Sequence, residues 1–211
     1  MLLDMNKRIG KIGTLVIYIL ILILSIINPI YPHEMYLQHS VTVLVAGILI
    51  YTTFKDNLTN KSFLFIAVFM IFHIIGTRWI YSFMPYDQWI NSLTGLSINN
   101  YFGFQRNQYD RLVHFLFGFM ILIPLREVYN KWFNCNGRIA ILLAFLSILS
   151  MSMIYEVFEW SISIFMPPED PEAYNGQQGD YWDAQKDMAL AFLGAVIMIL
   201  LLLVKRKTLR T

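Results

Sequence analysis

Ionisable side chains lie in or beside the long apolar runs of this sequence. A charged group at membrane depth costs roughly 3 kcal/mol on insertion scales, so such residues by default mark a functional site. Most of them occur in pairs spaced by three or four residues, which places both members of a pair on one face of a helix. The eight residues are His73, Arg78, Asp110, His114, Glu156, Glu159, Asp183 and Asp187.

Five of these eight side chains are carboxylates. Carboxylates held close together repel one another, and burial disfavours their charged form further. Arg78 and the neighbouring Arg111 supply two positive charges, which do not balance five carboxylates, or six with Asp180. A divalent metal ion would make up the difference, so the sequence predicts a metal site. The predicted ligands are His114, Glu156, Glu159, Asp183 and Asp187.

The donor types limit the metal without identifying it. Histidine with carboxylates suits zinc, manganese or iron, whereas an all-oxygen subset suits magnesium or calcium. The single cysteine, Cys135, excludes an intrachain disulfide and thiol-based zinc sites. A bound metal ion could lower the pKa of a coordinated water to about 7. In such a site we expect Arg78 to neutralise an anionic group, and His73 or Asp110 to act as general base or acid.

Structural interpretations of individual residues stay open beside these. His73 could be a hydrogen-bonded packing residue, and Arg78 could neutralise Glu156 or Glu159 without binding any ligand. Arg111 fits an interfacial anchor that extends its charge toward water. Two glycines, Gly118 and Gly194, are expected at contacts between helices.

The elements that must position these residues are apolar runs. Only 14% of the 211 residues are charged and 57% are hydrophobic, whereas a soluble domain carries about 25% charged residues. The sequence therefore predicts an all-α fold, a polytopic transmembrane helix bundle of about six spans that forms a single integral-membrane domain over residues 1–211. No basic patch with interleaved aromatic residues indicates nucleic-acid binding, and no oligomeric state follows from the sequence. The spans are expected at about 12–30, 37–54, 62–84, 111–130, 138–166 and 184–204.

Positive charge predicts the orientation of these spans. With a cytoplasmic N-terminus, twelve of the sixteen Lys and Arg residues fall on the cytoplasmic side, and every inner loop contributes to them. The C-terminus is then cytoplasmic as well. This orientation places all eight residues toward the outer face, where three helix faces would form a pocket open to the outside.

Five polar segments between residues 73 and 188 carry most of these ionisable residues. They are His73-x-x-x-x-Arg78, Arg106-Asn107-x-Tyr109-Asp110-Arg111-x-x-His114-Phe115-x-x-Gly118-Phe119, Arg126-Glu127, Tyr155-Glu156-x-x-Glu159-Trp160 and Gln178-Gly179-Asp180-x-Trp182-Asp183-x-Gln185-x-Asp187-Met188. These segments resemble the YjdF-type family of bacterial inner-membrane proteins. The resemblance implies a six-span protein of the bacterial inner membrane and carries over no established activity. It adds Asn107, Asp180 and Gln185 to the residues near the pocket, and Gly179 suggests a tight turn with Asp180 as a helix N-cap.

Three functions are compatible with these residues. The first is a metal-dependent hydrolase or transferase that acts on lipid or polyprenyl head groups, with the lipid bilayer and a lipid or other anionic small molecule as partners. The second is an ion- or proton-coupled transporter or ion-binding protein, in which the charges form a relay around His73. The third is a structural or accessory membrane subunit, in which the charges only hold helices together.

Overall fold

The computed structural model describes residues 2–29, 31–165 and 177–208, and all regular elements in these ranges are helices. Six of them contain a segment long and apolar enough to cross a membrane. The predicted all-α bundle of six spans is therefore confirmed. The long helices are α1 (Leu2–Ile26), α2 (Pro32–Lys55), α3 (Asn60–Arg78), α6 (Tyr109–Trp132), α7 (Gly137–Phe165) and α9 (Asp183–Thr208).

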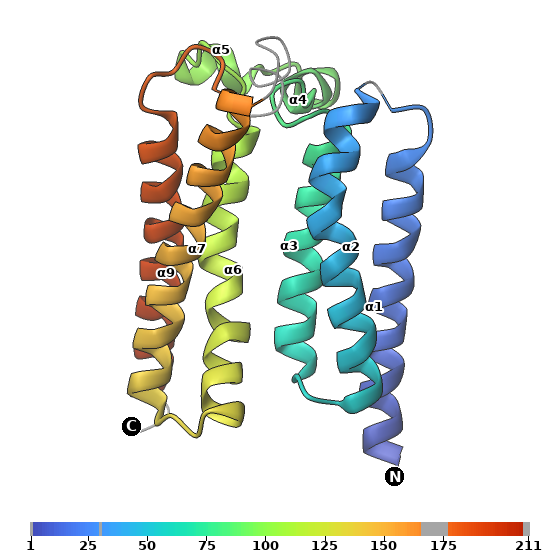
Figure 1. The fold of residues 1–211 in the computed structure, drawn as a ribbon, viewed down its shortest axis with the longest axis vertical. Coiled ribbons are helices and arrows are strands. Elements are labelled where there is room, and N and C mark those ends of the chain that lie inside the picture. The colour runs from blue at the N-terminus through green and yellow to red at the C-terminus, as the bar shows by residue number, and fades with distance from the viewer. Residues whose placement is uncertain (1, 30, 166–176, 209–211) are drawn as a thin grey trace.

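The long helices form two groups of three. Helices α1, α2 and α3 make one group and α6, α7 and α9 the other, and α3 packs against α6 where the groups meet (Figure 1). The start of α1 and the end of α9 lie at one end of the bundle, and the short helices α4 (Tyr86–Thr94) and α5 (Ile98–Phe102) lie across the opposite end. We call this opposite end the α4/α5 end. Its assignment to the outer face rests on the distribution of Lys and Arg and stays a prediction.

Local signals explain several helix boundaries. Pro32 opens α2 at a position where its missing N–H is not needed, and the Thr59 hydroxyl caps α3 by accepting from the Ser62 N–H. Helix α3 ends at Arg78, earlier than the expected boundary at 84, because Ile80 and Tyr81 adopt φ values of 45° and 53°. The expected boundaries at residues 30 and 166 lie outside the described residues.

Helices α4 and α5 form a small polar-capped unit that the sequence analysis did not anticipate. The Asp87 carboxylate accepts from the Ser97 hydroxyl at 2.8 Å and from the Asn99 N–H at 3.0 Å. The Asn99 N–H holds the pKa of Asp87 below its usual range. This carboxylate therefore ties the first turn of α4 to the start of α5.

Helices α6 and α9 pack tightly against each other, and both run from the α4/α5 end toward the opposite end (Figure 1). A Cβ atom on Gly118 would lie 1.8 Å from the Ala191 carbonyl oxygen, and one on Gly194 would lie 2.1 Å from the Phe115 oxygen. Only glycine permits such backbone contact. Residues four apart lie about one turn apart on the same face of an α-helix. Because both helices run in the same direction, this contact places His114, one turn before Gly118, beside Asp187, one turn before Ala191.

Candidate functional site

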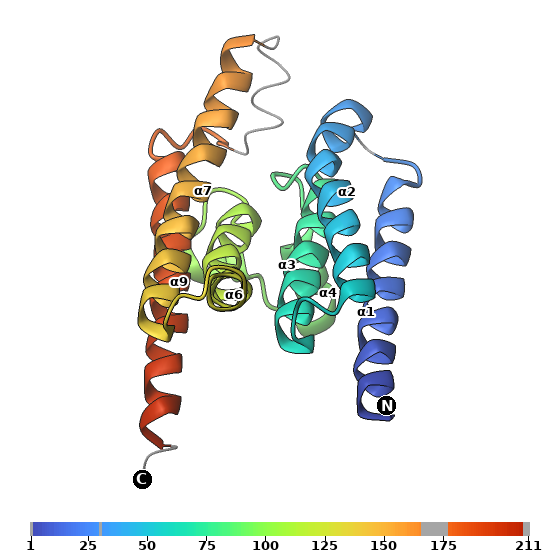
Figure 2. The ribbon, with the colours of Figure 1, turned by 60° about the horizontal axis from the view of Figure 1, so that its bottom comes forward.

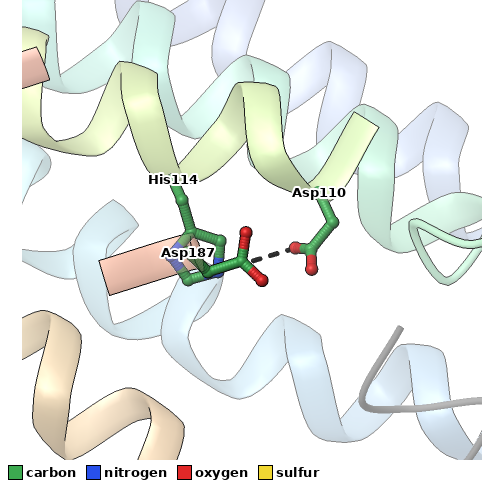
Figure 3. Close-up of side chains that lie close together, drawn as sticks. All are labelled: Asp110, His114 and Asp187. Atoms are coloured by element: carbon green, nitrogen blue, oxygen red, sulfur yellow. Dashed lines mark ion pairs between the residues drawn. The ribbon is translucent and has the colours of Figure 1, made fainter. Parts of the chain in front are cut away.

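Helices α6 and α9 bring Asp110, His114 and Asp187 together at the α4/α5 end (Figure 3). Each of the three offers one ligand atom, and these atoms all lie within 4.8 Å of one another. The three residues are nearly inaccessible to solvent, with exposed fractions of 7%, 8% and 2%. The distance from His114 Nε2 to Asp110 Oδ1 is 3.6 Å, which is too long for a hydrogen bond. We call these three residues the His/Asp cluster.

Helix α7 adds two buried glutamates to this cluster. Glu156 Oε1 lies 3.7 Å from His114 Nε2, on the same nitrogen that faces Asp110. Within the described residues, neither Glu156 Oε1 nor Asp187 Oδ1 has a hydrogen-bond partner, although both atoms are buried. Glu159 differs, because the Tyr155 side chain hydrogen-bonds to it. The unpartnered Glu156 Oε1 thus faces the imidazole nitrogen that Asp110 also approaches, and Asp187 Oδ1 is a second unpartnered carboxylate oxygen of the same cluster.

The arginines form ion pairs with carboxylates outside the His/Asp cluster. Arg106 forms a close ion pair with Asp183, and Arg111 forms one with Asp180. Lys186 also contacts Asp180 at 2.6 Å, and its hydrogen bond lowers the pKa of Asp180 to about 2. Among the described residues, no Lys or Arg nitrogen lies within 4 Å of the carboxylates of Asp110, Glu156 or Asp187. The predicted ligand Asp183 is therefore engaged by an arginine, whereas Asp187 is not.

His73 lies next to the His/Asp cluster without belonging to it. Its Nδ1 hydrogen-bonds with the Tyr81 hydroxyl, and its Nε2 lies 3.4 Å from the Gln38 carbonyl oxygen. His73, Asp110 and His114 line the same cavity of about 180 Å³. Both ring nitrogens of His73 have partners, so the structure supports a packing role beside the predicted role in acid–base chemistry.

Arg78 points away from the carboxylates. Its guanidinium donates to the carbonyl oxygens of Ser25 and Ile27 at 2.8 Å, and to that of Leu24 at 3.4 Å. These carbonyls are at the C-terminal end of α1, where a helix leaves its last oxygens without internal partners and where a cation is favourable. The structure thus does not bring Arg78 to the site, where Arg106 and Arg111 stand instead.

Replacing Arg78 by methionine is expected to lower the free energy of unfolding by about 1–3 kcal/mol, because several carbonyls at the end of α1 lose a charged donor. The metal content of the purified protein is expected to stay unchanged. Thermal unfolding in detergent and elemental analysis check the two expectations. The exposed Arg138 at the start of α7 provides a matched Arg138→Met control. A loss of metal on Arg78→Met would restore Arg78 to the site.

The residues suggested by the family resemblance lie at the edge of the site. Asn107 donates to the Met84 carbonyl at 2.7 Å and accepts from the Tyr109 N–H, so it fixes the start of α6. Gly179 adopts φ 79° in a turn, and the Asp180 carboxylate accepts from the Trp182 N–H just before α9 begins. Gln185 lines a second cavity of about 300 Å³ between α7 and α9.

Sequence reasoning assigned no role to Arg106, Tyr155 or Ser152. Arg106 precedes α6 in a connection, so no helical spacing relates it to Asp183. Tyr155 stands four residues before Glu159, a spacing that could have indicated their hydrogen bond. Ser152 is buried on the α7 face that carries Tyr155 and Glu159, and it lines the 180 Å³ cavity.

The fold and the site together define a multi-pass membrane protein with a buried histidine and carboxylate cluster at one end of the bundle. The chain belongs to the DUF2238 family, described as a predicted membrane protein, which matches residues 11–208. It is 29% identical over 162 residues to the inner membrane protein YjdF of Escherichia coli (strain K12), covering 76% of this chain and 73% of that protein. No solved structure matches the chain. The predicted family and the predicted location in a bacterial inner membrane are confirmed by these matches and by the six apolar helices.

Proposed function

We propose that the chain is a metal-dependent membrane enzyme, a hydrolase or transferase that acts on lipid or polyprenyl head groups. The observation that carries this proposal is the His/Asp cluster, in which three buried ligand atoms from two helices lie within 4.8 Å of one another. Asp110, His114 and Asp187 are the proposed metal ligands. Glu156 is the fourth, because its Oε1 lies 3.7 Å from His114 Nε2.

The distances favour a metal ion over direct hydrogen bonds. Ligand atoms about 2.1 Å from one ion lie roughly 3–4 Å from each other in tetrahedral or octahedral geometry. The two carboxylate oxygens near His114 Nε2 lie at 3.6 and 3.7 Å from it, within that range. An ion would also give Glu156 Oε1 and Asp187 Oδ1 the partner that the described residues do not provide.

The charge balance supports the same proposal. Arg106, Arg111 and Lys186 form their ion pairs with Asp180 and Asp183, at the rim. Asp110, Glu156 and Asp187 form none with Lys or Arg in the part of the chain that the structure describes, so burying them together as anions needs another cation. One nitrogen and three carboxylates suit zinc, manganese or iron, and magnesium if the histidine is not a ligand.

The reaction proposed is cleavage or transfer at an ester or phosphoester of a head group. When bound, the metal ion lowers the pKa of a coordinated water to about 7 and polarises the ester oxygen. In hydrolysis, the water oxygen bonds to the acyl carbon or phosphorus and the bond to the alcohol oxygen breaks. One water proton passes to a carboxylate, for which Glu159 is placed beside the cluster, and is then delivered to the departing alcohol.

Transport is the second candidate, and the packing of α6, α7 and α9 argues against a path through this group. Toward the termini, the same three helices enclose a buried apolar cluster. Gly118 and Gly194 bring the backbones of α6 and α9 into contact just below His114. Any ion path would need to cross this contact. The residues of the apolar cluster are Leu122, Ile123, Ala144, Ile148, Ala191, Ala195 and Met198.

Elemental analysis of the protein purified in detergent tests the proposal. We expect about one divalent ion per chain, bound with a Kd in the micromolar range or tighter, about −8 kcal/mol. His114→Ala and Asp110→Ala are expected to lose the ion and, with it, any release of head groups from a panel of phospholipids and polyprenyl phosphates. Glu34→Ala, an acidic residue in the first turn of α2 away from the cluster, is the matched control. A folded, metal-free wild type that regains no ion on dialysis would overturn the proposal.

A further inference from the structure

We infer that the 180 Å³ cavity between the two helix groups is a lateral lipid site, which takes the head-proximal part of one acyl or prenyl chain from the bilayer between α2 and α7. This inference rests on the proposed function and adds to it where the chain lies and how the lipid enters. We call this space the lateral cavity. It is lined by Val41, Phe69, Met70, His73, Tyr81, Asp110, Val113, His114, Phe117, Met151, Ser152 and Tyr155.

The lateral cavity has a floor and two walls. Helices α3 and α6 pack against each other and form the floor, while α2 and α7 contribute the walls. Helix α2 packs on α1 and α3, and α7 packs on α6 and α9, so the two walls belong to different groups. Figure 2 shows α2 and α7 on the same side of the α3/α6 contact. The cavity is thus a side pocket between two groups, rather than a channel inside either of them.

Its entrance faces the membrane interior. Val41 on α2 is 48% exposed and Met151 on α7 is 47% exposed, whereas Met70, Val113 and Ser152 are buried. Both entrance residues lie within membrane-spanning helices. A surface at this level is covered by lipid chains, so the molecule most available to the entrance is a lipid.

The lining changes from apolar to polar along the cavity. Phe69, Phe117 and Met151 supply apolar and aromatic surface at the level of the spans, and Asp110 and His114 stand at the end near α4 and α5. This polarity matches an amphiphile whose chain lies toward the membrane centre and whose head lies at the proposed metal. The anionic oxygens of a phosphate or carboxylate ester would complement that ion.

Ser152 is an independent observation that points to a ligand in the lateral cavity. It lines the cavity and is 2% exposed, yet its hydroxyl has no hydrogen-bond partner among the described residues. A serine inside a helix ordinarily donates to the carbonyl four residues earlier, as Ser161 and Ser163 do. A buried hydroxyl without this bond is costly unless a ligand atom accepts its proton. The ester carbonyl at the head-proximal end of an acyl chain is such an acceptor, whereas the hydrocarbon beyond it is not.

The volume limits how much of the lipid is held. Pockets that enclose a whole drug-sized ligand have volumes of about 300–1,000 Å³, and a cavity of roughly 150 Å³ is filled by benzene. The lateral cavity, at about 180 Å³, therefore takes only a short length of chain next to the head group. The rest of the chain stays in the bilayer, which the entrance between Val41 and Met151 permits.

Photolabelling in nanodiscs tests the inference. The probe is a phosphatidylglycerol with a diazirine on the head-proximal part of one acyl chain, and the labelled peptides are mapped by mass spectrometry. We expect labels on the α6 and α7 segments that line the cavity. Val41→Trp and Met151→Trp fill the entrance and are expected to reduce these labels by about tenfold, equivalent to about 1.4 kcal/mol. Val43→Trp and Ile154→Trp, at positions 61% exposed on the same two helices, are the matched controls.

Each outcome decides between the inference and the function on which it rests. Labels unaffected by both entrance substitutions, or absent from the lining segments, would overturn the lipid site. Entrance-sensitive labelling of a protein that binds no metal would support the lipid site and contradict the proposed function. Competition by excess unlabelled phosphatidylglycerol on the wild type gives the same decision if a tryptophan variant fails to fold.

Discussion

Replacing Gly118 by alanine is expected to lower the free energy of unfolding by about 4 kcal/mol or more, which is exceptional for the addition of one methyl group. The new Cβ would lie 1.8 Å from the Ala191 carbonyl oxygen, 2.7 Å from the Ala191 carbonyl carbon and 2.9 Å from the Ala195 nitrogen. All three are backbone atoms of α9, so no side-chain rotation relieves the overlap. Helices α6 and α9 must separate, and the bundle loses this tight helix contact.

The sign of the change in the free energy of unfolding distinguishes a close helix contact from the effect of helix propensity. In a helix without close neighbours, glycine to alanine is stabilising by about 0.5–1 kcal/mol. Gly13 in α1 and Gly47 in α2 are such positions, because a Cβ added to either would meet nothing within 4 Å. Gly13→Ala and Gly47→Ala are therefore the controls, and we expect both to be neutral or stabilising.

Unfolding by increasing denaturing detergent in mixed micelles measures all three variants on one scale. Gly118→Ala should unfold at a much lower denaturant fraction than the wild type, or fail to accumulate in the membrane. A Gly118→Ala protein as stable as the Gly47→Ala control would show that α6 and α9 are farther apart than in the structure. The alignment of His114 with Asp187, and with it the proposed metal site, would then lose its support.

The six-span fold was predictable because it depends on the length of the apolar runs in the sequence. An apolar stretch of about 20 residues spans the hydrocarbon core whatever its neighbours are, so all six spans follow from composition alone. The end of α3 did not, because it depends on positive φ values at Ile80 and Tyr81, which nothing in these residue types announces. The helices α4 and α5 are short and lie outside the spans, where no membrane constraint sets their length.

The candidate site was predictable to the extent that helical spacing determines it. Pairs at i and i+4 share a helix face, so Asp110 with His114, and Asp183 with Asp187, are expected to point in one direction. Which face of α6 meets which face of α9 depends on the rotation of each helix about its axis. The Gly118 contact with Ala191 sets this rotation, and it makes Asp187 a neighbour of His114.

Helical spacing does not predict the partners of the arginines. Arg78 and Arg106 both lie toward the α4/α5 end, and charge balance alone does not distinguish them. The structure assigns Arg78 to carbonyls at the end of α1 and Arg106 to Asp183. A flexible guanidinium reaches several partners, so its choice depends on the connections before α6 and after α1, which carry no helical period.

The change in stability caused by Asp187→Asn is expected to have opposite signs with metal and without it. In the presence of chelator, we expect the variant to be more stable than the wild type by about 1–2 kcal/mol, because the buried Asp187 Oδ1 has no partner among the described residues and a neutral amide removes its charge. With saturating metal, the order is expected to invert. A ligand present at 100 times its Kd stabilises the folded state by about 2.7 kcal/mol, and the variant loses most of that gain.

Asp183, one helical turn earlier on α9, supplies the matched control. Because Arg106 pairs closely with Asp183, Asp183→Asn leaves the partly buried guanidinium with the longer contact to Asp180 at 3.6 Å and is expected to destabilise the protein by about 1–3 kcal/mol. This loss should be the same with metal and with chelator. Of two aspartates one turn apart on one helix, only Asp187 is thus expected to change its effect on stability when metal is removed.

Thermal unfolding of the wild type and both variants, each with metal and with chelator, tests whether the cluster binds the metal ion that the proposed enzyme requires. A metal-dependent enzyme predicts the inversion at Asp187. A purely structural cluster predicts that the effect of Asp187→Asn on stability is the same in both conditions, since no ion would then bind the carboxylate. A proton-coupled transporter predicts that no difference between the variants depends on metal, because its carboxylates exchange protons with water and hold no ion. The inversion therefore tests what the geometry around His114 Nε2 implies, that the carboxylates are held apart by the space for an ion rather than joined by hydrogen bonds.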